Sequence, residues 1–138
     1  MTSPDTSERP PCVLLSSAFG YETVALLANR FPHAHFELLP PSGEVPDHAA
    51  DARALLRKSM PHSALHTALD GAPGIEWIHT ASAGFNWVLT PRVAASDIVL
   101  TRTANVLNKP IAEFVVAMAL ALFKGLPAFL NQQRERQW

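Results

Sequence analysis

A run of small residues, Ser82-Ala83-Gly84, follows an apolar segment and precedes Phe85 and Asn86. A turn does not require three small residues in succession, but such residues let another group approach the backbone closely. Backbone N–H groups left unpaired in a turn form a concave positive surface, which binds an anion without a charged side chain. The pattern therefore favours an anion-binding loop, and the alternative is an ordinary tight turn.

The same stretch has a weaker similarity to the G-x-S-x-G nucleophile turn of α/β hydrolases. Thr80 stands where the first glycine of that motif belongs, and no histidine follows Ser82 in the sequence. In that fold the catalytic histidine comes after the serine, and it accepts the proton of the nucleophile. We therefore interpret Ser82 as part of a binding loop rather than as a nucleophile.

Helical spacing brings His62, His66 and Asp70 onto one side of a predicted helix. His62 and Asp70 would be roughly 12 Å apart at 1.5 Å per residue, which is too far for one ion. We interpret the three side chains as a solvated helix face, and we predict no metal site in the chain. The Mg²⁺ site of a receiver domain is also excluded, because residues 16–19 after the first predicted strand contain no carboxylate.

The composition is that of a globular protein rather than a disordered one. The chain has 138 residues, of which 48% are hydrophobic and 17% charged, and its net charge is −1. No basic block is present, so we expect no nucleic acid and no membrane as partners. Cys12 is the single cysteine, which is typical of a cytoplasmic protein. Residues 1–11 lack an apolar core and predict a flexible tail, not a signal peptide.

Short apolar segments alternate with segments of helical periodicity. We predict strands at residues 12–17, 35–39, 54–57, 75–81 and 97–103, and helices at residues 21–31, 61–70, 90–96 and 110–134. Thr90 should cap the helix at 90–96, with Pro91 at its first position. This order predicts an α/β fold: a flavodoxin-like five-stranded parallel sheet with helices on both faces, plus a long C-terminal crossover helix. Ligands of such sheets bind at the carboxyl ends of the strands. Lys58-Ser59 and the loop from Ser82 to Asn86 both follow strands, so we expect them to be neighbours.

Several segments resemble the D-isomer-specific 2-hydroxyacid dehydrogenases. EWIHTASAGFNWVLTP, residues 76–91, resembles the family's W-x-x-x-x-S-A-G-x-D segment, and ALLRKS, residues 54–59, resembles its A-L-L-V-R-S strand and loop. Residues 97–122 resemble the strand that leads into V/I-A-E and a long apolar helix. LPAFLNQQRERQW, residues 126–138, resembles the end of that helix.

The resemblance implies an enzyme that moves hydride between NAD or NADP and a small 2-hydroxy or 2-keto acid. It implies a flavodoxin-like substrate-binding domain at residues 12–108 and an interdomain helix at 109–138, after which a Rossmann domain would begin. None of the 6 glycines forms the G-x-G-x-x-G motif of that domain. We therefore expect no catalytic residues in this chain, no tight cofactor binding and no activity of the chain alone.

The resemblance also assigns roles to individual residues. The backbone of Ser82, Ala83, Gly84, Phe85 and Asn86 would face the carboxylate of the substrate, with Asn86 in place of the family's usual Asp. Lys58 and Ser59 would form the opposite side of the pocket, in place of the usual Arg-Ser. Leu107 and Asn108 would face the nicotinamide. Asn105 replaces a frequent Gly, and it is the next best residue for a left-handed backbone.

The predicted helix at residues 110–131 is apolar on nearly all sides. Such a helix must be covered all round, and in the family it packs against both domains. If one of these is missing, an exposed apolar surface remains, and such surfaces usually mark interaction sites. The alternative function is therefore a non-catalytic binding or self-assembly module that acts through this helix.

Overall fold

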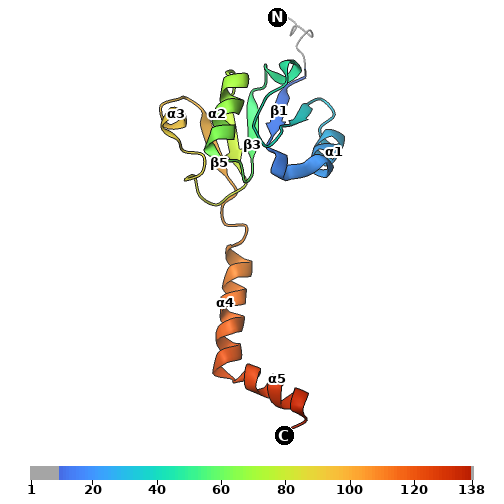
Figure 1. Cartoon of the computed structure of the whole chain (residues 1–138), viewed down its shortest axis with the longest axis vertical. Helices are drawn as coiled ribbons and strands as arrows, with labels where there is room; N and C mark the ends of the chain where they lie inside the picture. The colour runs from blue at the N-terminus through green and yellow to red at the C-terminus, as the bar shows by residue number, and fades with distance from the viewer. Residues whose placement is uncertain (1–9, 138) are drawn as a thin grey trace, which may run out of the picture. The chain divides into compact units, whose positions relative to one another are not determined.

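The computed structural model describes residues 10–137, so residues 1–9 of the predicted flexible tail lie outside the described residues. The chain divides into two compact units, of which the first ends at Thr103 and the second begins at Ala104. The first unit contains a sheet and its helices, and the second contains two helices (Figure 1). The predicted boundary at residues 108/109 falls inside the second unit.

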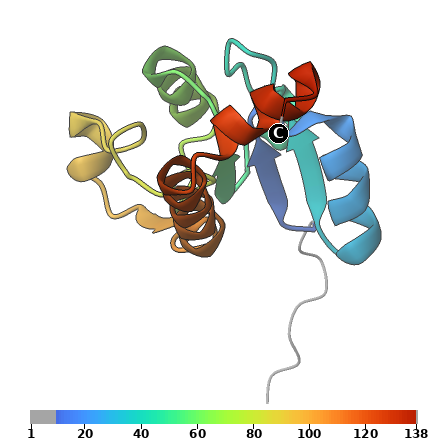
Figure 2. The same cartoon turned by 90° about the horizontal axis from the view of Figure 1, so that it is seen from below.

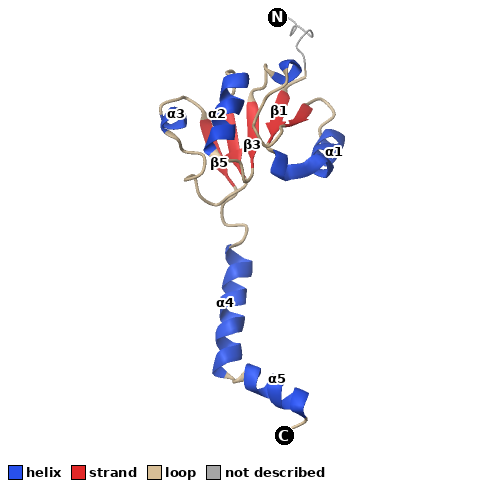
Figure 3. Ribbon diagram, viewed as in Figure 1, coloured by secondary structure: helices blue, strands red, loops and turns tan. Residues whose placement is uncertain are grey.

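The first unit is built on a parallel sheet, as predicted. Its strands are β1 (Cys12–Leu15), β2 (His35–Leu38), β3 (Ala54–Arg57), β4 (Trp77–Thr80) and β5 (Val99–Arg102) (Figure 3). They form one 5-stranded sheet in the order β2-β1-β3-β4-β5, and every neighbouring pair is parallel. The flavodoxin-like fold predicted from the sequence is confirmed.

The helices of the first unit lie between the strands in the sequence. They are the 3₁₀ helices η1 (Ser17–Phe19) and η2 (Asp47–Ala49) and the α-helices α1 (Gly20–Arg30), α2 (His62–Gly71) and α3 (Pro91–Ala94). The expected cap of α3 is confirmed, because the Thr90 side chain accepts a hydrogen bond from the Val93 N–H at 3.3 Å. The two 3₁₀ helices were not predicted.

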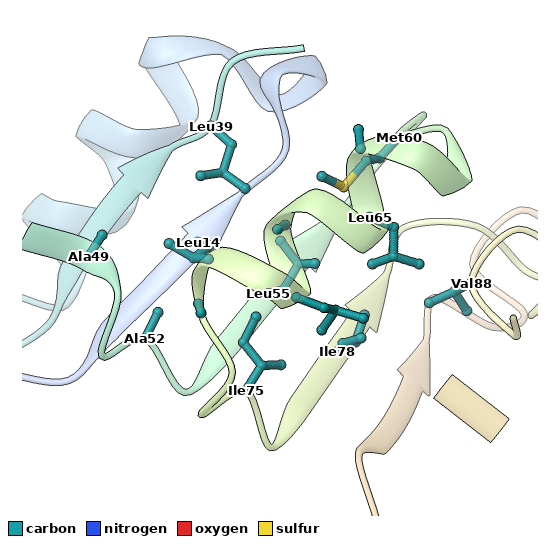
Figure 4. Packing of buried hydrophobic residues seen from close by; sticks show 14 of the residues in the cluster. Leu14, Leu39, Ala49, Ala52, Leu55, Met60, Leu65, Ile75, Ile78 and Val88 are labelled. Carbon is teal, nitrogen blue, oxygen red and sulfur yellow. The ribbon is translucent and has the colours of Figure 1, made fainter. Parts of the chain in front are cut away.

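The core lies on one face of the sheet, beneath α2. Leu14, Leu55 and Ile78 from three strands are fully buried against Leu65 of α2 (Figure 4). Leu15 is also fully buried but outside this cluster, and strand alternation turns it to the opposite face. On that face Phe36 of β2 contacts Phe31, which directly follows α1. Helices therefore cover both faces, and Figure 2 shows α1 and α2 flanking the strands.

The second unit corrects the prediction of one continuous helix over residues 110–134. Helix α4 spans Asn108–Phe123 and α5 spans Leu126–Glu135. The break falls at Lys124-Gly125, where Gly125 has a left-handed backbone with φ 66°. Among the described residues no single helix is long and apolar enough to cross a membrane. The two helices reach that length and composition only as a pair bent by 62°.

Candidate functional site

The candidate site lies where β3 and β4 end side by side. Arg57 and Thr80, the last residues of these strands, are paired in register, and the Ala81 N–H donates to the Arg57 carbonyl at 2.9 Å. A cavity of about 420 Å³ opens here, lined by Arg57, Ser59, Met60, Pro61, Ser82 and Trp87. The lining comes from both loops, so the prediction that they are neighbours is confirmed.

The small-residue loop is held through its carbonyl groups and hydroxyls. The Ser82 hydroxyl lies 2.8 Å from the Thr80 hydroxyl and donates to the Gly84 carbonyl at 2.9 Å. The Arg102 guanidinium donates to the Ala83 carbonyl and lies 5.4 Å from the ring centroid of Phe85. Two successive carbonyl groups of the loop are thus fixed by side chains.

The N–H groups of the same loop are left unpaired. The N–H groups of residues 82–87 donate no hydrogen bond to any of residues 10–137, whereas those of Ala81 and Val88 on either side do. Ala83, Gly84 and Asn86 are exposed. These N–H groups are therefore free to donate to a bound anion, as turn N–H groups do in anion-binding loops.

The side chain of Asn86, which stands in place of the family's usual Asp, does not hold the turn. Within residues 10–137 its side chain makes no hydrogen bond. Instead the Phe85 carbonyl accepts from the N–H groups of Val88 at 2.9 Å and Leu89 at 2.8 Å. The side chain of Asn86 is exposed.

Of Lys58 and Ser59, which were predicted to form the opposite side of the pocket, only Ser59 lines the cavity. Ser59 has a left-handed backbone with φ 48°, which is uncommon outside glycine. The Lys58 ammonium lies 5.6 Å from the ring centroid of Phe19. The buried Ser16 hydroxyl fixes this loop, because it bonds both the N–H and the carbonyl of Lys58 at 2.8 Å.

Arg57 is the functional candidate that the sequence reasoning missed. Its side chain lines the cavity although the residue is only 4% exposed. One terminal nitrogen donates to the Met60 carbonyl at 2.5 Å, and another lies 3.4 Å from the Thr80 hydroxyl. The buried Nε has no partner, and no carboxylate among the described residues forms an ion pair with it. Burial lowers the pKa of the guanidinium from its usual value, because desolvation disfavours the charged form.

The sequence did hold one signal for Arg57. It is the only charged residue in the buried strand Ala54–Arg57, and a buried cation without a counter-ion is costly unless something compensates it. Trp87 and Met60 also line the cavity, and nothing in the sequence pattern marked them.

The two residues predicted to face a cofactor lie in the second unit. Leu107 precedes α4 and is exposed, and Asn108 begins α4 with its side-chain amide donating to the Asn105 side chain at 3.0 Å. Asn105 has φ 65°, so the prediction of a left-handed backbone there is confirmed.

Comparisons with known proteins support the resemblance seen in the sequence, although no family model matches the chain. A glyoxylate reductase of Thermofilum pendens is 33% identical over 70 residues, which are 51% of this chain and 21% of that protein.

Solved structures match over a longer range. Proteins of the D-isomer specific 2-hydroxyacid dehydrogenase family from Klebsiella pneumoniae and Aeromonas salmonicida match 97% and 95% of the chain, with TM-scores of 0.66 and 0.64 and 23% identity each. A structure of the pyruvate reductase of Chlamydomonas reinhardtii matches 92% with a TM-score of 0.56 and 16% identity. The chain spans about two-fifths of the length of these structures, 39–41%. It is thus similar in sequence to a glyoxylate reductase and in fold to D-isomer specific 2-hydroxyacid dehydrogenases, which confirms the predicted resemblance.

Proposed function

We propose that the first unit is the substrate-binding lobe of an NAD(P)-dependent D-2-hydroxyacid dehydrogenase. Such an enzyme moves hydride between a nicotinamide and C2 of a small 2-hydroxy or 2-keto acid. One observation carries the proposal: the loop of residues 82–87, whose N–H groups are unpaired within residues 10–137, borders at Ser82 and Trp87 a cavity that the buried, partly unpaired Arg57 also lines. Both features attract the same class of ligand, an organic anion.

The chain's own residues would bind and orient the acid. The N–H groups of the loop would donate to the carboxylate, and Ser82 lies where the loop meets the cavity. Ala83 and Gly84 keep the loop open, and a Cβ added at Gly84 would meet no atom within 4 Å. Holding the acid in one orientation lowers the entropic part of the barrier to a reaction at C2.

The described residues do not by themselves fit a dinucleotide. The sequence has no G-x-G-x-x-G turn for the phosphates. Of the two residues proposed to face the nicotinamide, Leu107 offers an exposed apolar side chain and Asn108 an amide already bonded to Asn105. We therefore propose that this chain alone holds NAD or NADP weakly and does not turn over substrate.

The direct test is a titration of the ¹⁵N-labelled chain with glycolate, followed by NMR. We expect the amide signals of residues 82–87 and the Nε–H signal of Arg57 to shift with millimolar affinity, equivalent to about 4 kcal/mol. Glycolamide, which has the same shape without the charge, is the control and should cause no comparable shifts. Equal shifts with both compounds would contradict an anion site.

The same preparation with NADH and glyoxylate is expected to show no loss of NADH absorbance. Turnover by the pure 138-residue chain would show that it contains catalytic groups, which would contradict the proposal that this chain alone is inactive.

A second candidate function, self-assembly through α4, rests on the exposure of its apolar side chains. None of the side chains of α4 is buried, and Leu122 and Phe123 are 72% and 87% exposed. Apolar surfaces of this kind usually mark interaction sites. The occupant that we propose is a second copy of the same helix.

Light scattering coupled to size exclusion tests this second candidate. We expect the chain to elute as a dimer or larger at high concentration, and Leu122→Lys to shift it toward the monomer because a charge is costly in an apolar interface. Gln133→Lys, on the exposed surface of α5, is the matched control and should leave the assembly unchanged. A parent chain that stays monomeric at its highest soluble concentration would refute self-assembly.

A further inference from the structure

Three metal-ligating side chains meet on the first unit, away from the candidate site. His35 and Glu37 belong to β2, and His48 belongs to η2. The Nε2 atoms of His35 and His48 lie 3.3 Å and 2.9 Å from the same Glu37 oxygen, Oε2. All three ligand atoms lie within 4.8 Å of one another. The histidines predicted to form only a helix face do not take part, and Asp70 on that helix pairs instead with Arg92 at 2.6 Å.

The donor set suits zinc. Two imidazole nitrogens and one carboxylate oxygen are a common set of three protein ligands for zinc, with the fourth position filled by water. Ligand atoms about 2.0–2.1 Å from a tetrahedral ion lie about 3.3 Å apart, and the separations of 3.3 Å and 2.9 Å are close to this value. Small rotations of exposed side chains would therefore be enough to admit the ion.

The backbone holds the three residues in place before any ion binds. His35 and Glu37 are two residues apart on a strand, so their side chains point to the same face. His48 is exposed, but the next residue, Ala49, is fully buried in the core and anchors η2. The rings of His35 and His48 also meet edge to face, with centroids 5.9 Å apart. A site whose ligands are fixed by a buried neighbour and a paired strand loses little entropy on binding.

The surroundings leave space for the fourth ligand. A cavity of about 240 Å³ adjoins the cluster, lined by Pro10, Cys12, His35, His48 and Asp51. Burial, followed by the charges of Asp51 and Glu37, raises the pKa of the Cys12 thiol to about 11. Both carboxylates therefore lie near Cys12. A water molecule in this cavity would complete a tetrahedral set without any further side chain.

We propose that His35, Glu37 and His48 bind a divalent ion of the zinc type. The ion would lie at the start of β2, the opposite end of the parallel strands from the candidate site. It would join an edge strand to η2, two segments that already meet through the His48–Glu37 hydrogen bond and the contact between the His35 and His48 rings. The proposal does not depend on the function proposed above.

Calorimetric titration of the untagged, chelator-treated full chain with Zn²⁺ is the test. We expect the titration to show one binding site. In thermal unfolding, the Tm of the chain should rise by roughly 10 °C or more when zinc exceeds its Kd about 100-fold. His48→Ala should lower zinc affinity by about 100-fold or more, since even outer-shell losses reach 10–100-fold. His48 is exposed, so the variant should fold, and circular dichroism would confirm this. Glu37→Gln should weaken binding in the same direction.

The matched control is His33→Ala, which removes an exposed histidine two residues before the cluster. It should bind zinc as the parent does. With Co²⁺ in place of Zn²⁺, the parent should show the intense visible absorption of tetrahedral cobalt, and His48→Ala should lose it. If the parent binds no zinc, or if His48→Ala binds as tightly as His33→Ala, the cluster is only a pair of hydrogen bonds to Glu37.

Discussion

Replacing Arg57 with methionine is expected to weaken the binding of glycolate to the full chain by about 10- to 100-fold. The guanidinium is buried at the cavity, and its Nε has no partner among the described residues. A hydrogen bond to a charged group contributes about 1.5–3 kcal/mol, which corresponds to this loss. Methionine keeps the buried stem of the side chain and removes the charge. NMR titration of the variant measures the change.

Two further variants show whether the loss is specific to Arg57. Arg57→Lys keeps the charge without the fork of donors, so we expect binding between that of the parent and that of Arg57→Met. Arg53→Met makes the same substitution at an exposed arginine that pairs with Glu76, and it should leave binding unchanged. Glycolate binding as tight in Arg57→Met as in the parent would remove Arg57 from the site. Because that variant also leaves the Met60 carbonyl without its donor, its unfolding by urea should be measured alongside.

The largest expected loss of stability follows from Gly43→Ala. Gly43 has φ +82°, and a Cβ there would lie 2.1 Å from the Ala64 carbonyl oxygen of α2. The methyl group cannot be accommodated unless the turn or α2 moves. Overpacking and a left-handed alanine together cost roughly 3–5 kcal/mol. Urea unfolding followed by circular dichroism should show a much lower midpoint.

Gly20→Ala separates the two causes of this loss. Gly20 has a similar φ of +73°, but an added Cβ meets no atom within 4 Å. Its ψ of 162° places it in a backbone region that is essentially restricted to glycine, so its substitution should cost only the backbone term, about 1–3 kcal/mol. Equal losses of stability in the two variants would mean that the turn at Gly43 does not pack closely against α2.

The elements that depend on local signals were predictable from the sequence. The strand at residues 54–57 was predicted with its observed bounds even though it ends in Arg57. The start of α3 was predicted from Thr90 and Pro91, because capping is a contact between neighbours in the sequence. Asn105 was expected in a left-handed conformation, and its φ of 65° confirms this. These features follow from a few adjacent residues.

The features that were missed depend on long-range contacts or on a choice between two local tendencies. Arg57 was not predicted as a site residue, because nothing local shows that its side chain ends at a cavity beside Trp87. The cluster at Glu37 needs His48 from another segment, and helical or strand periodicity cannot bring these together. The bend at Gly125 was missed because apolar periodicity outweighed a single glycine in the pattern.

The strand order of the sheet also bears on how this unit folds during synthesis. Each strand after the first pairs with one that precedes it in the sequence: β2 and β3 with β1, β4 with β3, and β5 with β4. No strand must wait for a partner that has not yet left the ribosome. The sheet can therefore grow outward from β1 in the order of translation, with few unpaired edges exposed to aggregation on the way.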